Sequence, residues 1–159
     1  MKAIHKTVLA LALSGIFICN ASLAATTCEG EVGTLNKELV KRGVVKINDP
    51  AKLATTLREL NQSGRLPKEY ITSAEAKKLN PSWDDSKTLW GLTPTNGKVI
   101  GGDAYRNSTL NGDKVWYSAD VDGSRGYRSN LRLIYSPETS KKYITPDKYQ
   151  RFLEVAPCQ

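Results

Sequence analysis

Arginines gather in one short segment of the sequence, where Arg125, Arg128 and Arg132 follow one another closely. Because Arg128 and Arg132 are four residues apart, a continuous strand would turn both side chains to the same face. Guanidinium groups suit phosphate because each offers a planar fork of hydrogen-bond donors. The segment is compatible with a phosphate site, although by itself it is more often a solvated basic rim.

A second candidate pair is Lys148 and Tyr149, which follow Pro146-Asp147. A lysine beside an aromatic residue fits a phosphate contact combined with stacking of a nucleobase. The commoner alternative is a surface lysine next to a core tyrosine. Asp120 and Asp122 form an acidic pair, and such residues are more often turn formers or arginine partners than catalytic groups.

The sequence Gly101-Gly102-Asp103 is the third candidate motif. It lacks the Gly-Lys-Ser/Thr ending of a phosphate-binding P-loop, and it is not a dinucleotide-binding fingerprint. By itself it indicates a place where the backbone bends or where another group approaches it closely.

The single histidine, His5, lies in a segment that is typical of a secretory signal. Residues 1–24 combine two lysines, an apolar run from Val8 to Cys19 and the small residues of Ser22-Leu23-Ala24. We expect this signal to be removed, which predicts a secreted or periplasmic protein without a membrane anchor. The rest of the chain has no histidine, so an imidazole acid or base, a Ser-His-Asp triad and a histidine metal site are excluded.

Composition predicts a single globular domain with a disulfide. The chain has 159 residues and a formal net charge of +7, with 40% hydrophobic and 25% charged residues. Cys19 lies in the expected signal, which leaves Cys28 and Cys158 near the two ends. An oxidising compartment would let these two pair, and two free thiols are the alternative.

The secondary-structure elements that must position the candidate site residues start with helices in the N-terminal half of the chain. Residues 25–46 form an N-terminal extension with a weak helical stretch over 35–42, which we expect the disulfide to fix in place. A clearer helix starts at Asp49-Pro50 and ends near Gly64, with leucines at helical spacing between them. Another starts at the capping box of Thr72 and Glu75 and stops near Asn80-Pro81.

A strand half follows, in which short β-rich runs alternate with turn sequences. The runs lie at 99–100, 115–121, 131–135, 143–144 and 152–155. Helices followed by antiparallel strands predict an α+β fold.

Several motifs then occur in the order found in one known family. They are Leu66-Pro67-Lys68-Glu69-Tyr70-Ile71-Thr72, Ile100-Gly101-Gly102-Asp103, Trp116, Ala119-Asp120, Gly126-Tyr127-Arg128-Ser129, Arg132-Leu133-Ile134-Tyr135-Ser136 and Asp147-Lys148-Tyr149-Gln150-Arg151-Phe152. Over residues 47–155 the chain resembles the barnase-type secreted bacterial ribonucleases. The resemblance implies N-terminal helices packed on a five-stranded antiparallel sheet, with the family domain at 47–159.

The same resemblance implies cleavage of single-stranded RNA by the ribose 2′-hydroxyl, without a cofactor or metal. Arg128 and Arg132 match the family's two phosphate-binding arginines. The general-base glutamate falls on Ser118 and the general-acid histidine on Lys148, whereas the tyrosine that follows is kept as Tyr149.

Two more family positions bear on the site. A helpful lysine of the family becomes Ser73, and the backbone-donor region of the guanine loop keeps Asn107. The glutamate that reads guanine has no clear counterpart in this sequence.

Three functions remain open at this point. The chain is a ribonuclease with substituted machinery, an inactive relative that binds RNA or another polyanion, or a protein-binding decoy for an acidic ribonuclease inhibitor. In each case we expect a monomer. In the first case Lys148 donates a proton or neutralises the leaving oxygen. Asp120 then orients Arg128 and Arg132, with a role as surrogate base as the alternative.

Overall fold

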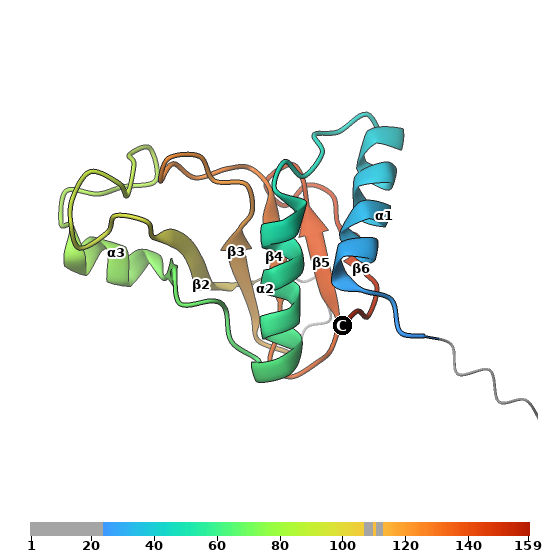
Figure 1. Ribbon diagram of the computed structural model, residues 1–159. Helices are drawn as coiled ribbons and strands as arrows, with labels where there is room; N and C mark the ends of the chain where they lie inside the picture. The colour runs from blue at the N-terminus through green and yellow to red at the C-terminus, as the bar shows by residue number, and fades with distance from the viewer. Residues whose placement is uncertain (1–23, 107–109, 111–112) are drawn as a thin grey trace, which may run out of the picture.

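The computed structural model describes residues 24–106, 110 and 113–159, and it shows three helices and a six-stranded sheet (Figure 1). The helices are α1 (Cys28–Lys41), α2 (Pro50–Ser63) and α3 (Ser73–Leu79). The strands are β1 (Tyr70–Ile71), β2 (Val99–Tyr105), β3 (Trp116–Asp120), β4 (Arg132–Tyr135), β5 (Lys142–Thr145) and β6 (Leu153–Val155). The α+β class is therefore confirmed, whereas the expected signal at 1–24 falls almost entirely outside the described residues.

The sheet follows the chain order from β1 to β6. The strands β2 to β6 are antiparallel and overlap the runs that the sequence predicted, although β2 continues to Tyr105, well beyond the predicted 99–100. The prediction of a purely antiparallel five-stranded sheet was wrong in one detail, because β1 adds a sixth strand that runs parallel to β2. A strand of only Tyr70 and Ile71 is too short to show the alternation that identifies strands in a sequence.

Helices α1 and α2 cover one face of the sheet and enclose the largest apolar cluster, which we call the main core. Its helical members are Cys28, Val32, Leu35, Leu39, Leu53, Ala54, Leu57 and Leu60, and its principal sheet members are Ala119, Leu133, Ile144, Leu153 and Val155. Because successive side chains of a strand point to opposite faces, the residues next to these core members along each strand lie on the other face of the sheet.

The N-terminal extension is more regular than the sequence indicated. Helix α1 begins at Cys28 and not at Leu35, and the Thr27 hydroxyl accepts a hydrogen bond from the Gly30 amide at its start. Gly30 and Gly33 weaken helix propensity in this segment, which is why the pattern predicted only the later part. Packing of the α1 side chains in the main core outweighs that weakness.

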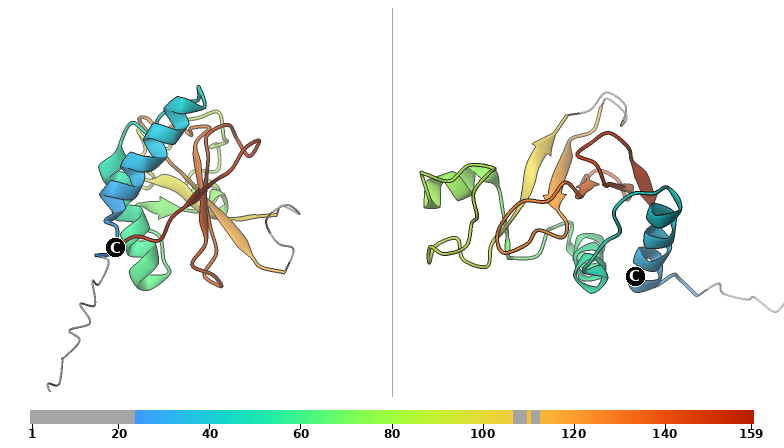
Figure 2. Two further views of the ribbon diagram at one scale, coloured as in Figure 1. Left: turned by 90° about the vertical axis from the view of Figure 1, so that its right-hand side faces the viewer. Right: turned by 90° about the horizontal axis from the view of Figure 1, so that it is seen from above.

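Cys28 and Cys158 form a disulfide that joins the start of α1 to the C-terminal segment. Figure 2 shows these two parts of the chain side by side. Their backbones also pair, since the Cys28 amide donates to the Gln159 carbonyl and the Gln159 amide donates to the Thr26 carbonyl. The predicted pairing of the two cysteines is confirmed.

Helix α2 starts as predicted, with Asp49 as its N-cap and Pro50 in its first turn. A second carboxylate, from a residue distant in the sequence, accepts hydrogen bonds from backbone amides at the same N-terminus of α2. Asp122, in the turn after β3, accepts hydrogen bonds from the Asn48 amide at 2.5 Å and the Asp49 amide at 3.0 Å.

Replacing Asp122 with alanine is expected to lower the free energy of unfolding by about 1–2 kcal/mol, because two backbone amides lose a charged acceptor. Asp122→Asn keeps one side-chain oxygen and tolerates the positive φ of 59° at this position, so its loss should be smaller. Urea unfolding of the two variants and the wild type measures this. An unchanged midpoint in Asp122→Ala would contradict the capping role.

The Gly101-Gly102-Asp103 motif has a structural role. Gly102 has a φ of +91°, and the register between β2 and β3 shifts between Gly101 and Asp103. A Cβ atom at Gly101 would lie 2.5 Å from Cδ1 of Tyr70, so this position admits only glycine without rearrangement. The prediction of a bend with a close approach is confirmed.

Candidate active site

The face of the sheet opposite the main core carries the polar residues that the sequence singled out. Tyr117 and Ala119 contact the main core, so Ser118 and Asp120 of β3 point to the other side. On the neighbouring strand β4, Ile134 lies opposite Ser118 and Arg132 lies opposite Asp120. We call this surface the site face.

Asp120 brings the two arginines of the predicted phosphate site together. Its carboxylate accepts hydrogen bonds from Arg128 Nε at 3.1 Å and Arg128 Nη2 at 2.9 Å, and Arg132 Nε lies 3.1 Å from the same group. Asp120 and Arg132 are almost fully buried, at 2% and 3% exposure. The carboxylate fixes both guanidinium groups, because a charge buried to this degree requires a partner.

The two arginines do not share one continuous strand, so strand alternation does not explain why they lie together. Arg132 is the first residue of β4, but Arg128 lies in the loop before it. The loop folds back because Ser129 contacts the carbonyl of Val121 and Arg132 Nη1 contacts the carbonyl of Ser129. The arginines therefore converge through Asp120 and not through strand alternation.

An exposed carboxylate also contacts Arg128. Arg128 Nη1 lies 3.0 Å from Oδ1 of Asp85, whose side chain is 69% exposed. Burial by itself would lower the pKa of the Arg128 guanidinium, but hydrogen bonding and charge attraction to Asp120 and then Asp85 raise it above its usual value. A phosphate that binds Arg128 must compete with Asp85 for Nη1.

Removing this competitor is expected to strengthen RNA binding. Asp85→Asn should raise the affinity for a non-cleavable, 2′-O-methylated RNA about two- to five-fold, which corresponds to the free energy of an exposed ion pair. Fluorescence anisotropy measures the affinity. Glu59→Gln removes the same charge from the solvent side of α2 and serves as the control, and an equal gain in both variants would show a general charge effect instead.

Lys148 and Tyr149 lie in the loop between β5 and β6, both with positive φ, at 54° and 72°. The Lys148 amide donates to the Asn130 carbonyl at 3.0 Å, which fixes this loop against the segment between the two arginines. The Lys148 side chain is exposed. The Tyr149 ring stacks on Tyr105, with 4.6 Å between the ring centroids, so one of its faces is already occupied.

Asp147 holds the turn that presents Lys148. Its carboxylate accepts hydrogen bonds from the Arg151 amide at 2.9 Å and Arg151 Nε at 2.5 Å. Partial burial would raise the pKa of Asp147, but these bonds from Arg151 hold it below its usual value.

Ser118 is buried at 6% exposure and has Asp103 of β2 as its neighbour in the adjacent strand. Ser73, at the position of the family's lysine, donates from its hydroxyl and its amide to the Asp103 carboxylate. In the sequence, Asp103 belongs to the candidate motif Gly101-Gly102-Asp103, which indicated a backbone bend or a close approach and not a functional carboxylate. Asn107, the candidate in the guanine loop, lies outside the described residues.

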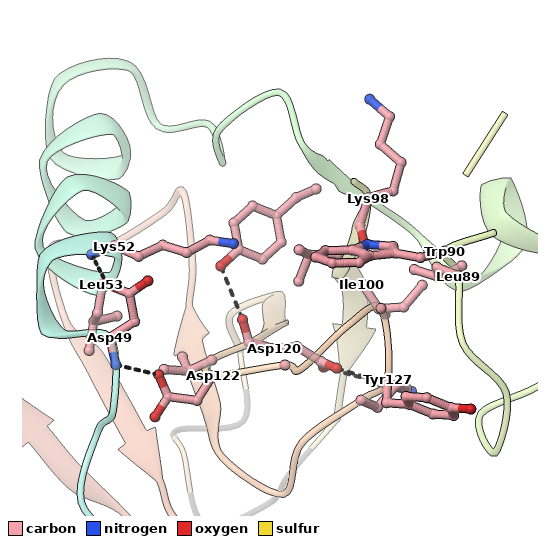
Figure 3. Close-up of a pocket in the computed structure, with 16 residues that line it drawn as sticks. Asp49, Lys52, Leu53, Leu89, Trp90, Lys98, Ile100, Asp120, Asp122 and Tyr127 are labelled. Atoms are coloured by element: carbon pink, nitrogen blue, oxygen red, sulfur yellow. Dashed lines mark hydrogen bonds and ion pairs between the residues drawn. The ribbon is translucent and has the colours of Figure 1, made fainter. Parts of the chain in front are cut away.

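A cavity of about 230 Å³ lies beside the site, between the start of α2 and the loop after β3 (Figure 3). Two of the aspartates that line it already take part in the fold: Asp122 caps α2, and the Asp120 carbonyl accepts a hydrogen bond from the Tyr70 hydroxyl at 3.0 Å. Burial raises the pKa of Tyr70 to about 12, so its hydroxyl remains a donor at neutral pH. Asp120 and Arg128 line this cavity too, so it adjoins the arginine cluster directly.

Comparison with known proteins places this arrangement in a class. No family model matches the chain. The chain is 36% identical over 97 residues to a ribonuclease of Heyndrickxia coagulans, and the match covers 57% of this chain and 84% of that protein. Ribonucleases of Bacillus intermedius and Bacillus pumilus match at the same identity, but the chain spans only 56% of their length.

The relatives are thus bacterial ribonucleases, and the α+β fold agrees with the resemblance that the motifs indicated. This chain belongs to the barnase-type bacterial ribonuclease family. Among the described residues, no helix is long and apolar enough to cross a membrane.

Proposed function

We propose that this protein is a secreted ribonuclease that binds single-stranded RNA and cleaves it through the ribose 2′-hydroxyl, with low or altered activity. The observation that carries the proposal is the cluster of Arg128 and Arg132 on Asp120, in a chain of the ribonuclease family. A ribonuclease needs cations fixed where charge develops on the phosphate in the transition state. Asp120 fixes both guanidinium groups, and Arg128 Nη1 becomes available to a phosphate that displaces the exposed Asp85.

The chemistry requires two proton transfers in addition. The 2′-oxygen loses a proton as it attacks phosphorus, and the 5′-oxygen gains one as its bond to phosphorus breaks, which leaves a 2′,3′-cyclic phosphate and a 5′-hydroxyl. Lys148 supplies an ammonium on a loop bonded to the arginine segment. Ser118 replaces the carboxylate of the family, and loss of a general base typically lowers the rate about 10²–10⁴-fold.

We also propose that the protein is exported from the cytoplasm. Residues 1–24 have the pattern of a secretory signal, and the Cys28–Cys158 disulfide suits an oxidising compartment. A small, monomeric, secreted enzyme would meet its RNA substrate outside the cytoplasm.

A second candidate function is RNA binding without turnover, which the serine at position 118 favours. Both candidates require the phosphate site. Arg128→Ala and Lys148→Ala should each weaken binding of single-stranded RNA and lower the slope of log affinity against log salt by about one unit. Arg65→Ala removes an exposed arginine from the opposite side of the sheet and should change neither quantity.

Cleavage of a labelled RNA oligonucleotide separates the two candidates. If the proposal is correct, the wild type produces fragments and Arg128→Ala is slower by about 10²–10³-fold. Binding that depends on Arg128 without any cleavage would establish the second candidate, and binding that none of the variants changes would overturn both.

A further inference from the structure

Asp103 places a carboxylate next to the position where the family's base is missing. Asp103 of β2 and Ser118 of β3 are direct partners in the antiparallel ladder. Side chains of directly opposed residues begin about 4.5–5.5 Å apart, measured between their Cβ atoms. The serine is smaller than the glutamate it replaces, so a side chain from β2 has room to reach the same region.

The bulge at Gly102 is what directs Asp103 to the site face. Gly101 pairs with Ala119, and in a regular ladder Asp103 would then pair with Tyr117, which contacts the main core. The extra residue shifts the register so that Asp103 pairs with Ser118. Bulges commonly re-aim a side chain in this way beside active sites.

The Asp103 carboxylate is held in place but its charge is not neutralised. Its contacts are the Ser73 amide, which donates to Oδ1 at 2.9 Å, and the Ser73 hydroxyl, which donates to Oδ2 at 2.5 Å. Within the described part of the chain, no lysine or arginine forms an ion pair with it. Each carboxylate oxygen has a second lone pair, so Asp103 can still accept a proton.

Asp120, by contrast, is unsuited to that task. Its oxygens face two guanidinium groups, and protonation would leave Arg128 and Arg132 without their counter-charge. Of Asp103 and Asp120, Asp103 is the one whose protonation breaks no ion pair.

We infer that Asp103 is the general base of this enzyme, an inference that rests on the proposed ribonuclease function. Asp103 takes the proton of the 2′-hydroxyl, directly or through one water, while the 2′-oxygen forms its bond to phosphorus. The bond from phosphorus to the 5′-oxygen breaks, and that oxygen receives a proton from the Lys148 ammonium. Arg128 and Arg132 hold the phosphate throughout.

The test compares Asp103→Asn with Ser118→Ala in the full protein. The asparagine keeps the shape of the side chain and an acceptor for Ser73, so folding should be retained, which urea unfolding checks. Asp103→Asn should lower kcat for RNA cleavage about 10²–10³-fold with little change in KM, and the acid limb of the pH profile should disappear. Ser118→Ala should cleave at nearly the wild-type rate.

Adding Ser118→Glu to Asp103→Asn distinguishes a base from a positioning residue. A new carboxylate on the neighbouring strand should restore most of the lost rate together with the acid limb. Failure of this rescue, or an Asp103→Asn variant with the wild-type rate and pH profile, would overturn the inference alone. A wild-type protein that binds RNA but does not cleave it would overturn the proposed ribonuclease function, and the inference with it.

Discussion

Replacing Ser118 by glutamate and Lys148 by histidine together is expected to raise kcat for RNA cleavage on the order of 10²-fold. The arginine cluster on Asp120 is already in place, so the new groups would act on a phosphate that is already held. Imidazole is the better acid at neutral pH because its usual pKa lies close to the pH of the reaction. The glutamate would stand on the site face, in the same row as Asp120.

The substitution at Ser118 introduces a carboxylate directly opposite Asp103, and like charges opposed across two strands destabilise a sheet. Adding Ser73→Lys should relieve this repulsion, because Ser73 already contacts Asp103. Steady-state cleavage of a labelled single-stranded RNA gives kcat, and urea unfolding confirms that each variant is folded.

Arg128→Ala in the same background is the control and should abolish the gain. If the restored enzyme gains no activity although it is folded and binds RNA, the site face does not align a substrate phosphate in the way that the family resemblance implies. If the increase in kcat persists in Arg128→Ala, the increased activity does not depend on the arginine cluster.

Reducing the Cys28–Cys158 disulfide is expected to lower the free energy of unfolding by about 4–5 kcal/mol. The two cysteines are 130 residues apart in the sequence, so the cross-link removes a large amount of conformational entropy from the unfolded chain. The folded state should change little, because Val32, Leu35 and Leu39 keep α1 in the main core without the disulfide.

Urea unfolding with and without dithiothreitol measures this loss. The variant Cys28→Ala/Cys158→Ala should unfold at the midpoint of the reduced wild type and should not respond to reductant. A wild type whose thiols are free but whose midpoint is unchanged would contradict the stabilising role. Catalytic activity should survive reduction at low denaturant, since the disulfide and the site face involve different parts of the chain.

Local sequence signals predicted the parts of the fold that depend on local chemistry. The Asp49-Pro50 start of α2 and the capping box of α3 were correct because caps satisfy backbone amides within a few residues. The first half of α1 and the strand β1 were missed for the opposite reason. Gly30 and Gly33 hide the helix, and β1 is defined only by its pairing with Val99 and Ile100.

The candidate site also has a part that the sequence predicted and a part that only the folded structure shows. Residue type made Arg128 and Arg132 candidates for a phosphate site and the family resemblance favoured that role, but the place where they meet depends on a loop that folds back on Asp120. Asp103 could not be recognised from spacing, because counting alternate residues along β2 from Gly101 assigns it to the wrong face. Two adjacent glycines signalled an irregularity, and only the paired strands show which way the bulge turns the next side chain.

The products formed from single-stranded RNA test the proposed ribonuclease function most directly. Incubation with a single-stranded RNA oligonucleotide, followed by mass spectrometry of the fragment ends, tests it in one measurement. We expect 2′,3′-cyclic phosphate and 5′-hydroxyl ends, formed slowly by the wild type and lost in Arg128→Ala. RNA that stays intact while fully bound, or fragments with other ends, would contradict the proposed function.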